Sequence, residues 1–317
     1  MRAVVYDRYG PPDRLRVDEL PVPSPGPDQV LIEVVATSIN LSDWECLRGA
    51  PSYARIGGLR TPKRRTLGSD IAGRVAAVGD QVGRFRPGDA VYGDNLQLMG
   101  GFAEYAVAPQ SVLVHKPEAM SFSDASTLPQ AGAIALQGTA GLSAGRRMLI
   151  NGAGGGSGAF AIQLAKQSGA HVTAIDNAGK LEFMRSLGAD EVGDYRRQDF
   201  TDFPPFDRIL DLVATRSAFA CRRALAPGGR YQCVGGLVRT LLPLAILGAV
   251  VGPLTGRRVE VLGVKQGPTH FEPLQERCVA GDVKIHIDRT FRLDEVPQAL
   301  AYVGAGRALG KVVVAVA

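Results

Sequence analysis

Residues 148–158 read MLINGAGGGSG, and the residues that follow, AFAIQLAKQSGA, carry a helical pattern of apolar side chains. The order is therefore strand, glycine-rich loop and helix. Glycines in such a loop let the backbone turn sharply and approach a pyrophosphate, whose charge the amides of the helix N-terminus can meet. The spacing is G-x-x-G-x-x-G at Gly152, Gly155 and Gly158 rather than the usual G-x-G-x-x-G. The stretch predicts a dinucleotide-binding loop, although glycine-rich turns also occur for purely structural reasons.

A carboxylate follows this loop at the spacing of a dinucleotide site. Asp176 ends the next predicted strand, VTAID, eighteen residues after Gly158. A carboxylate there can accept hydrogen bonds from the adenosine ribose of the cofactor. The cofactor-binding residues predicted from the loop, from this acid and its surroundings and from the end of a later strand are Gly152, Ala153, Gly154, Gly155, Gly156, Ser157, Gly158, Asp176, Lys180, Val234 and Gly235.

Strands and helices alternate around the loop. Six apolar runs, at 148–151, 171–176, 191–194, 208–212, 230–234 and 259–264, predict strands, and helical patterns separate most of them. Right-handed crossovers would join these strands into a doubly wound parallel sheet. We therefore predict an α/β fold whose dinucleotide-binding domain covers residues 121–265 and starts at a helix cap, Ser121 or Ser123.

The flanking residues show a different pattern. Short β-branched runs at 2–6, 29–36, 71–78, 90–92 and 103–107 alternate with glycine and proline turns, which is typical of an antiparallel, barrel-like domain. After Lys265 we expect helices at 273–279 and 294–304, a strand at 284–288 and a final valine-rich strand at 311–316, which needs a sheet to join. We predict a substrate domain made of residues 1–120 and 266–317, interrupted by the dinucleotide-binding domain.

Composition and charge disfavour several classes of protein. The net charge of +5 is spread over isolated arginine pairs and one run, Lys63–Arg65, which is more typical of solvated surface than of a nucleic-acid-binding face. The four cysteines include no C-x-x-C pair, which disfavours a disulfide framework or a four-cysteine zinc lobe and favours a reducing compartment. The N-terminus has no apolar signal core, so we expect a cytoplasmic protein.

One strongly apolar stretch spans residues 241–254. It is 14 residues long and contains two prolines and two glycines, whereas a membrane span needs about 20 apolar residues. We expect no membrane span but a buried or pocket-lining helix, which hints at a lipophilic substrate. Contact with a membrane surface is the alternative.

Segments that cover nearly the whole chain carry a resemblance to one superfamily. They are VVATSINLSD at 34–43, LGSDIAGRVAAVG at 67–79, RPGDAVYG at 86–93, GGFAEYAVA at 100–108, GRRMLINGAGGGSG at 145–158, SLGADEVGDY at 186–195 and ALGKVVVAV at 308–316. They resemble the medium-chain dehydrogenase/reductase superfamily and, within it, the zinc-free quinone oxidoreductase branch. The resemblance implies a GroES-like substrate domain with an inserted Rossmann domain, NAD(P)H as the cofactor, Tyr195 near its adenosine end and a tendency to form homodimers.

The positions that bind catalytic zinc in the superfamily's alcohol dehydrogenases differ in this chain. Those enzymes use a cysteine in the segment matching SINLSD and a histidine in the segment matching LGSD, where this chain has Asn40 and Ser69. Neither side chain is a competent zinc ligand, so we expect no metal. Without a Lewis acid, the resemblance implies reduction of an acceptor that is already electrophilic, a quinone or an α,β-unsaturated carbonyl.

Asn40 and Tyr53 are the catalytic candidates. The resemblance places Asn40 towards the substrate and the nicotinamide, where its amide could donate a hydrogen bond to a developing enolate or quinol oxygen. The alternative is an asparagine that caps the helical turn SDWECLRG, where Asp43 is also expected to act as a cap. Tyr53 lies in a variable loop that often carries substrate-facing tyrosines, and it is a candidate proton donor or ring stacker, or an ordinary loop tyrosine.

The residues of this chain and the family resemblance favour different cofactors. Many members of the branch use NADPH, with small or basic residues at the position of Asp176. A carboxylate roughly 4–5 Å from a 2′-phosphate costs about 3–4 kcal/mol at an effective dielectric near 20. We expect Lys180 and Arg196 to be long, hydrated side chains whose exposed ion pairs contribute about 1 kcal/mol or less. The residues therefore predict NADH.

Two other functions stay open. Enoyl-thioester reduction would use basic residues at the pocket mouth, a role for Lys63–Arg65. The second open function is that of a non-catalytic NAD(P)H-binding protein. Such a protein would act as a redox sensor, an RNA binder or a lens-type structural protein. Ile134, at a position where the family usually has a threonine near the nicotinamide, and Gln130, at a normally apolar position, leave room for it.

Overall fold

The chain divides into two units in the computed structural model, which describes residues 1–55, 58–203, 205–244 and 256–316. The first unit comprises residues 1–133 and 265–317, and the second comprises residues 134–264. The inserted unit thus begins later than residue 121, because α2 (Phe122–Ser126) packs on strands of the first unit. Of the two predicted caps, Ser121 and Ser123, it is Ser121 that caps α2, since its hydroxyl accepts a hydrogen bond from the amide of Asp124.

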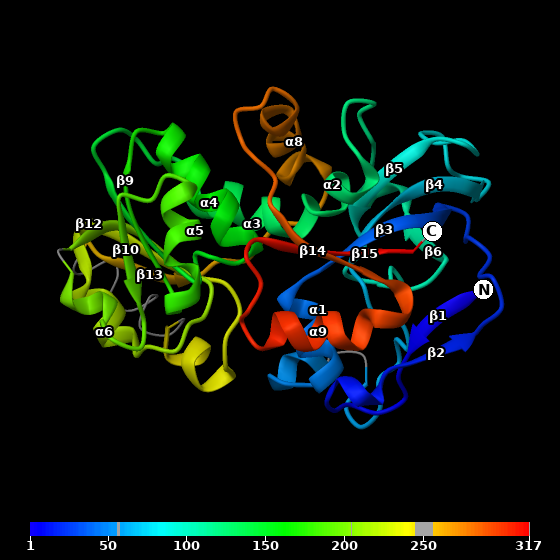
Figure 1. Cartoon of the computed structure of the whole chain (residues 1–317), viewed down its shortest axis with the longest axis horizontal. Helices are drawn as coiled ribbons and strands as arrows, with labels where there is room; N and C mark the ends of the chain where they lie inside the picture. The colour runs from blue at the N-terminus through cyan, green and yellow to red at the C-terminus, as the bar shows by residue number, and fades with distance from the viewer. Residues whose placement is uncertain (56–57, 204, 245–255, 317) are drawn as a thin grey trace. The chain divides into compact units, whose positions relative to one another are not determined.

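The second unit contains the predicted parallel sheet (Figure 1). Its six strands lie in the order β10-β9-β8-β11-β12-β13, and every neighbouring pair is parallel. This confirms the doubly wound α/β fold, with each strand within a few residues of its predicted position. The bounds are β8 (Arg147–Asn151), β9 (His171–Asp176), β10 (Glu191–Asp194), β11 (Phe206–Asp211), β12 (Leu225–Cys233) and β13 (Arg258–Val261).

Helices connect these strands. The helix that follows the glycine loop, α4 (Gly156–Gln167), buries Phe160, Ile162 and Leu164 and packs on β8 and β9. Burying three large apolar side chains contributes several kcal/mol, so the packing of the helix on the sheet holds the start of α4 in place. The other elements are α5 (Leu181–Ser186), α6 (Ala218–Arg223) and the short 3-10 helices η4 (Ala178–Lys180) and η5 (Phe200–Asp202).

The first unit is built on a seven-stranded sheet. Along it lie β14 (Ile287–Arg292), β15 (Lys311–Ala315), β3 (Gln29–Ile39), β4 (Asp70–Val78), β5 (Ala90–Asp94) and β7 (Leu113–His115), while β6 (Tyr105–Pro109) pairs with β3. The valine-rich final strand, β15, pairs antiparallel with β3, which confirms the sheet that we expected it to join. The strand predicted at 284–288 lies at 287–292 instead, parallel to β15.

The remaining elements of this unit cover the sheet or connect its strands. A hairpin of β1 (Arg2–Val5) and β2 (Arg16–Glu19) forms a separate small sheet. The helices are α1 (Leu41–Arg48), α3 (Pro129–Thr139), which continues into the second unit, α8 (Glu272–Val279) and α9 (Val296–Gly304). Short 3-10 helices are η1 (Pro12–Arg14), η2 (Ser52–Arg55), η3 (Gln110–Val112), η6 (Pro268–His270) and η7 (Leu293–Glu295).

The register of the large sheet brings four strand ends together. Ser38, near the end of β3, pairs with Asp70 at the start of β4, and Asp70 pairs with Asp94 at the end of β5. On the other side of β3, Val312 pairs with Ile39, which places Lys311 beside the β3 terminus. Polar residues far apart in the sequence therefore meet at one edge of this sheet.

The apolar stretch at 241–254 falls mostly outside the described residues. Of residues 241–244, which are described, Leu244 is buried and Leu242 is exposed. Within the described parts of the chain, no helix is both long enough and apolar enough to span a membrane.

Candidate functional site

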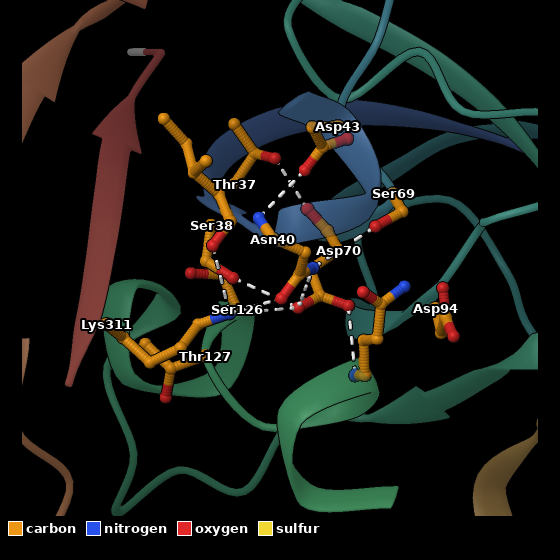
Figure 2. Close-up of polar contacts among 12 residues, drawn as sticks. Thr37, Ser38, Asn40, Asp43, Ser69, Asp70, Asp94, Ser126, Thr127 and Lys311 are labelled. Atoms are coloured by element: carbon orange, nitrogen blue, oxygen red, sulfur yellow. Dashed lines mark hydrogen bonds and ion pairs between the residues drawn. The ribbon is translucent and has the colours of Figure 1, made fainter. Parts of the chain in front are cut away.

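The converging strand ends of the first unit form a buried group of polar side chains (Figure 2). We call it the polar cluster and define it as Ser38, Asn40, Asp43, Ser69, Asp70, Asp94 and Lys311. Each of these residues is at most 7% exposed. Buried polar groups are stable only when hydrogen-bonded, so the bonds within the cluster determine what each side chain can do.

Asp70 is the central acceptor of the cluster. Its Oδ2 accepts hydrogen bonds from Ser38 Oγ at 3.0 Å and from Asn40 Nδ2 at 2.8 Å. Lys311 Nζ lies 3.5 Å from the same oxygen. Burial raises the pKa of Asp70 and lowers that of Lys311, while the attraction between the two charges opposes both shifts. Removing either partner would leave an uncompensated charge in the interior.

Both the nitrogen and the oxygen of the Asn40 carboxamide are hydrogen-bonded within the cluster. Nδ2 donates to Ser69 Oγ at 3.2 Å and to Asp70 Oδ2 at 2.8 Å, and Oδ1 accepts from Lys311 Nζ at 2.6 Å. Because an ammonium only donates and a carboxylate only accepts, these partners fix the orientation of the amide. Asn40 is also the residue before α1 that we considered as a cap. Direct donation to a substrate stays a prediction, and it requires one of these bonds to be exchanged.

Two further carboxyls crowd the cluster. Asp43 accepts from the backbone amides of Asn40 at 2.9 Å and Gly68 at 3.0 Å, so it caps α1 as expected. Burial raises its pKa to about 7. Burial, followed by the charge of Asp70, raises the pKa of Asp94 to about 8. With three carboxyls around the Lys311 ammonium, the cluster holds protons near neutral pH.

Tyr53 lies in η2 and contacts a carboxyl that we did not identify from the sequence. Its hydroxyl is 3.3 Å from both carboxylate oxygens of Glu45, a residue of α1. Burial raises the pKa of Glu45 to about 7. The pair forms a second polar group on α1, and its place in catalysis stays a prediction.

Gln130, noted above as an unusual residue for its position, connects to both α1 and the cluster. Its backbone amide donates to Asp70 Oδ1 at 3.1 Å. Its side-chain Oε1 accepts from Ser42 Oγ at 2.9 Å. Gln130 is partly exposed, in contrast to the buried cluster, and nothing in the sequence pointed to Ser42.

Asn40 and Ser69 bond to one another and not to a thiol or an imidazole. Across the residues that the structure describes, no group of three or more histidine, cysteine, aspartate or glutamate side chains is arranged to hold a metal ion. The disposition of these residues therefore gives no support to a zinc site.

The second unit brings the predicted cofactor residues to one edge of its sheet. The glycine loop follows β8, Asp176 ends β9, Tyr195 follows β10, and Val234 and Gly235 follow β12. The carboxyl ends of parallel strands are where doubly wound folds bind ligands. Tyr195 lies next to Asp176, because its amide donates to the Asp176 carbonyl at 3.1 Å.

The glycine loop fits a pyrophosphate. Gly152 has φ +80°, a conformation that favours glycine, and a Cβ on Gly158 would lie 2.5 Å from the Ala153 backbone. A Cβ on Gly155 would meet no atom closer than 3.6 Å, so there is space above the loop. The first amides of α4, at residues 156–158, have no acceptor within the helix and are suited to bind phosphate oxygens.

Asp176 and Lys180 form a buried pair, which contradicts our expectation that Lys180 is exposed. Lys180 is 6% exposed and Asp176 is 8% exposed, and their charged atoms are 3.4 Å apart. Lys180 begins the helical turn four residues after Asp176, so its side chain packs against Gly154 rather than extending into solvent. The carboxylate also accepts hydrogen bonds from Gly154 N at 3.0 Å, Asn177 N at 2.8 Å and Asn177 Nδ2 at 3.0 Å.

Two family models match the chain. The alcohol dehydrogenase GroES-like domain matches residues 26–118, and a zinc-binding dehydrogenase model matches residues 187–314. The 2-methylene-furan-3-one reductase of Solanum lycopersicum is 34% identical over 329 residues, covering 99% of this chain and 79% of the relative. The chloroplastic quinone-oxidoreductase QR1 of Triphysaria versicolor is 32% identical over 335 residues, covering 99% and 98%.

A solved structure extends the similarity to three dimensions. The quinone oxidoreductase of Coxiella burnetii has a TM-score of 0.89 and 28% identity, covering 100% of this chain and 99% of that one. The matches include both the GroES-like unit and the six-stranded parallel unit. The chain therefore belongs to the medium-chain dehydrogenase/reductase superfamily of NAD(P)H-dependent oxidoreductases, in its quinone oxidoreductase-like branch.

Proposed function

We propose that this protein is a zinc-independent reductase that uses NAD(P)H to reduce a quinone or an α,β-unsaturated carbonyl compound. The observation that carries the proposal is the bonding of Asn40, whose amide is held by Lys311, Ser69 and Asp70 at the position where the resembling alcohol dehydrogenases bind zinc. With no Lewis acid to bind an alcoholate, only an acceptor that is already electrophilic suits the site. The relatives from Solanum and Triphysaria are described as reductases of such acceptors.

The residues that would hold the cofactor are those at the carboxyl edge of the parallel sheet. The amides at the start of α4 would bind the pyrophosphate, and Asp176, Lys180 and Tyr195 would surround the adenosine ribose. The nicotinamide, when bound, supplies the hydride. The protein then has to orient the acceptor, stabilise the negative charge that develops on its oxygen and allow a proton to reach it.

The first unit supplies these functions. Lys311 and Asp70 fix Asn40, and Glu45 holds the hydroxyl of Tyr53, the proposed proton donor. Asp43 and Asp94, with pKa values of about 7 and about 8, keep the interior beneath the site from accumulating negative charge near neutral pH. A hydride and one proton together complete the two-electron reduction of the acceptor.

The buried Asp176–Lys180 pair changes the proposed cofactor preference. An unpaired carboxylate beside the 2′-phosphate would favour NADH, but the Lys180 ammonium compensates the charge of Asp176. We propose that the protein binds NADH and NADPH with affinities within about tenfold of each other, a difference of about 1.4 kcal/mol.

A panel of acceptors tests the proposed activity. Oxidation of NADH and of NADPH is followed by ultraviolet absorbance with quinones, enones and enoyl thioesters in parallel. We expect turnover with quinones or enones. Cofactor binding without turnover on any acceptor would contradict the proposal and favour a binding protein.

Enoyl-thioester reduction is less well supported. Arg65 forms an ion pair with Asp7 at 2.7 Å, and Arg64 donates to the Leu96 carbonyl at 3.1 Å. Two of the three basic side chains in the run that was expected to bind a thioester's phosphate groups therefore have partners elsewhere. A marked preference for enoyl thioesters in the panel would reverse this ranking.

A further inference from the structure

We propose that the side-chain amide of Gln130 hydrogen-bonds the oxygen of the acceptor, the atom on which negative charge develops during reduction. The inference rests on the proposed function and assigns a substrate contact within it. It replaces Asn40 as the direct donor and gives Asn40 a positioning role.

The two carboxamides, of Asn40 and Gln130, differ in what they are bonded to. Asn40 donates both of its amide hydrogens, to Ser69 and Asp70, and is 7% exposed. Gln130 is partly exposed, and its Nε2 donates to no acceptor in the described parts of the chain. An amide with two undonated hydrogens at the margin of a buried cluster is available to a ligand without breaking any existing bond.

The Gln130 side chain is held in one orientation. The Gln130 carboxamide oxygen is engaged by the Ser42 hydroxyl, and its backbone amide is bonded to Asp70, a buried residue of the cluster. With the backbone and the carboxamide oxygen both fixed, Nε2 is the end of the side chain that remains free. A donor oriented in advance stabilises developing charge better than a mobile one, since little reorganisation is needed when the reaction occurs.

Gln130 and Tyr53 are both hydrogen-bonded to α1. Gln130 bonds to Ser42 and Tyr53 bonds to Glu45, and these two partners are three residues apart on α1. Residues with this spacing lie on the same face of a helix, with Cβ atoms about 5–6 Å apart. Gln130 and Tyr53 are therefore both hydrogen-bonded to one face of α1, and they come from segments 77 residues apart in sequence.

The chemistry needs only a hydrogen bond from Gln130. When hydride adds to the β-carbon of an enone, a C–H bond forms there, the carbon–carbon π bond breaks, and its electron pair moves to give an enolate. Gln130 donates to the enolate oxygen and gives up no atom. A proton from Tyr53 or from solvent then completes the reduction, and the Glu45 carboxyl or solvent reprotonates Tyr53.

Substitution separates this role from a structural one. We expect Gln130→Leu to lower kcat about 10- to 100-fold with KM and the cofactor Kd within about threefold of the wild type. Gln130→Glu should lower kcat further above neutral pH and recover part of it as the carboxyl is protonated. Ser42→Ala, which releases the carboxamide oxygen, should give an intermediate loss. Gln298→Leu, an exposed position on α9, is the matched control and should leave kcat unchanged.

A binding measurement makes the test independent of turnover. 4-Nitrophenol reports the charge on its oxygen by its visible absorbance, and a donor to that oxygen lowers the pKa of the bound phenol. We expect the wild-type protein with NADP⁺ to lower this pKa and Gln130→Leu to abolish the shift, with melting temperatures unchanged.

Unchanged kcat in Gln130→Leu, or a bound-phenol pKa that is the same in wild type and variant, would overturn the inference. If the wild type reduces no acceptor, the proposed function fails, and the phenol measurement alone then decides whether Gln130 binds an oxyanion.

Discussion

The two units of this protein each bury a lysine–carboxylate pair, but with different charge balance. In the second unit, Lys180 faces one carboxylate, Asp176, which also accepts hydrogen bonds from three further N–H groups. In the first unit, Lys311 lies 3.5 Å from the carboxylate of Asp70 and also interacts electrostatically with the carboxyls of Asp43 and Asp94. The arrangement around Lys180 is close to neutral and fixes a loop, whereas the one around Lys311 has excess carboxyls, which bind protons. The comparison shows that the surroundings of a pair, not its residue types, determine what it does.

The largest expected effect is the loss of the cation from the polar cluster. Lys311→Met leaves three buried carboxyls without their ammonium, and we expect it to lower the free energy of unfolding by about 3–5 kcal/mol. Urea denaturation measures the change. Adding Asp70→Asn to this variant should recover part of the loss, and a single variant as stable as the wild type would contradict the arrangement described for the cluster.

The corresponding change in the other unit acts on ligand affinity. Lys180→Met leaves the Asp176 charge uncompensated, so we expect NADPH affinity to fall about 100- to 1000-fold relative to NADH. Fluorescence titration with both cofactors gives the ratio. Asp176→Asn in the same background should restore it, because the repelling charge is gone. If Lys180→Met leaves the ratio of NADPH to NADH affinity unchanged, the Asp176–Lys180 pair does not contact the adenosine ribose of the cofactor.

The excess carboxyls predict the pH dependence of stability. The pKa values of Asp43 and Asp94 are raised to about 7 and about 8, so the folded protein binds protons that the unfolded chain has already released. Their contribution therefore makes the free energy of unfolding fall as pH rises from about 4 to about 8, after which it is constant. Asp94→Asn should remove the fall between about pH 7 and pH 8 and lessen it at lower pH, so the variant gains stability relative to the wild type as the pH rises. If the stability of the wild type and of Asp94→Asn depends on pH in the same way, Asp94 is not a source of this pH dependence.

The smallest effect concerns Glu45 and Tyr53. Burial raises the pKa of Glu45 to about 7, so above neutral pH it ionises and accepts a stronger hydrogen bond from the tyrosine hydroxyl, which holds the proton more tightly. We expect turnover to decline above pH 7 and Glu45→Gln to remove this decline, while Tyr53→Phe lowers kcat about tenfold. A decline that persists in Glu45→Gln would assign it to another group.

The features that local sequence could predict are those that depend on neighbouring residues. The strand, glycine loop and helix at 148–167 are set by local chemistry, and so is Asp176 at the end of the next strand. The resemblance alone implied that Asn40 and Ser69 stand where the alcohol dehydrogenases of the superfamily have zinc ligands. The burial of Lys180 against Asp176 was not predicted, because we expected a hydrated side chain.

The features that escaped prediction depend on strand register and packing. Lys311 contacts Asn40 across 271 residues, because β15 pairs with β3 in one particular register. Glu45 and Ser42 acquire partners only once η2 and α3 lie against α1. The unit boundary after residue 133 reflects the packing of α2 on the sheet of the first unit, which no change in composition marks.

The most direct test of the account compares reduction with and without metal on one preparation. The protein is dialysed against a chelator, its zinc content is measured, and quinone and enone reduction are assayed with NADH and NADPH before and after zinc is added back. We predict less than stoichiometric zinc, full reductase activity after chelation and no alcohol oxidation in either state. Activity that disappears with the chelator and returns with zinc would contradict the central claim.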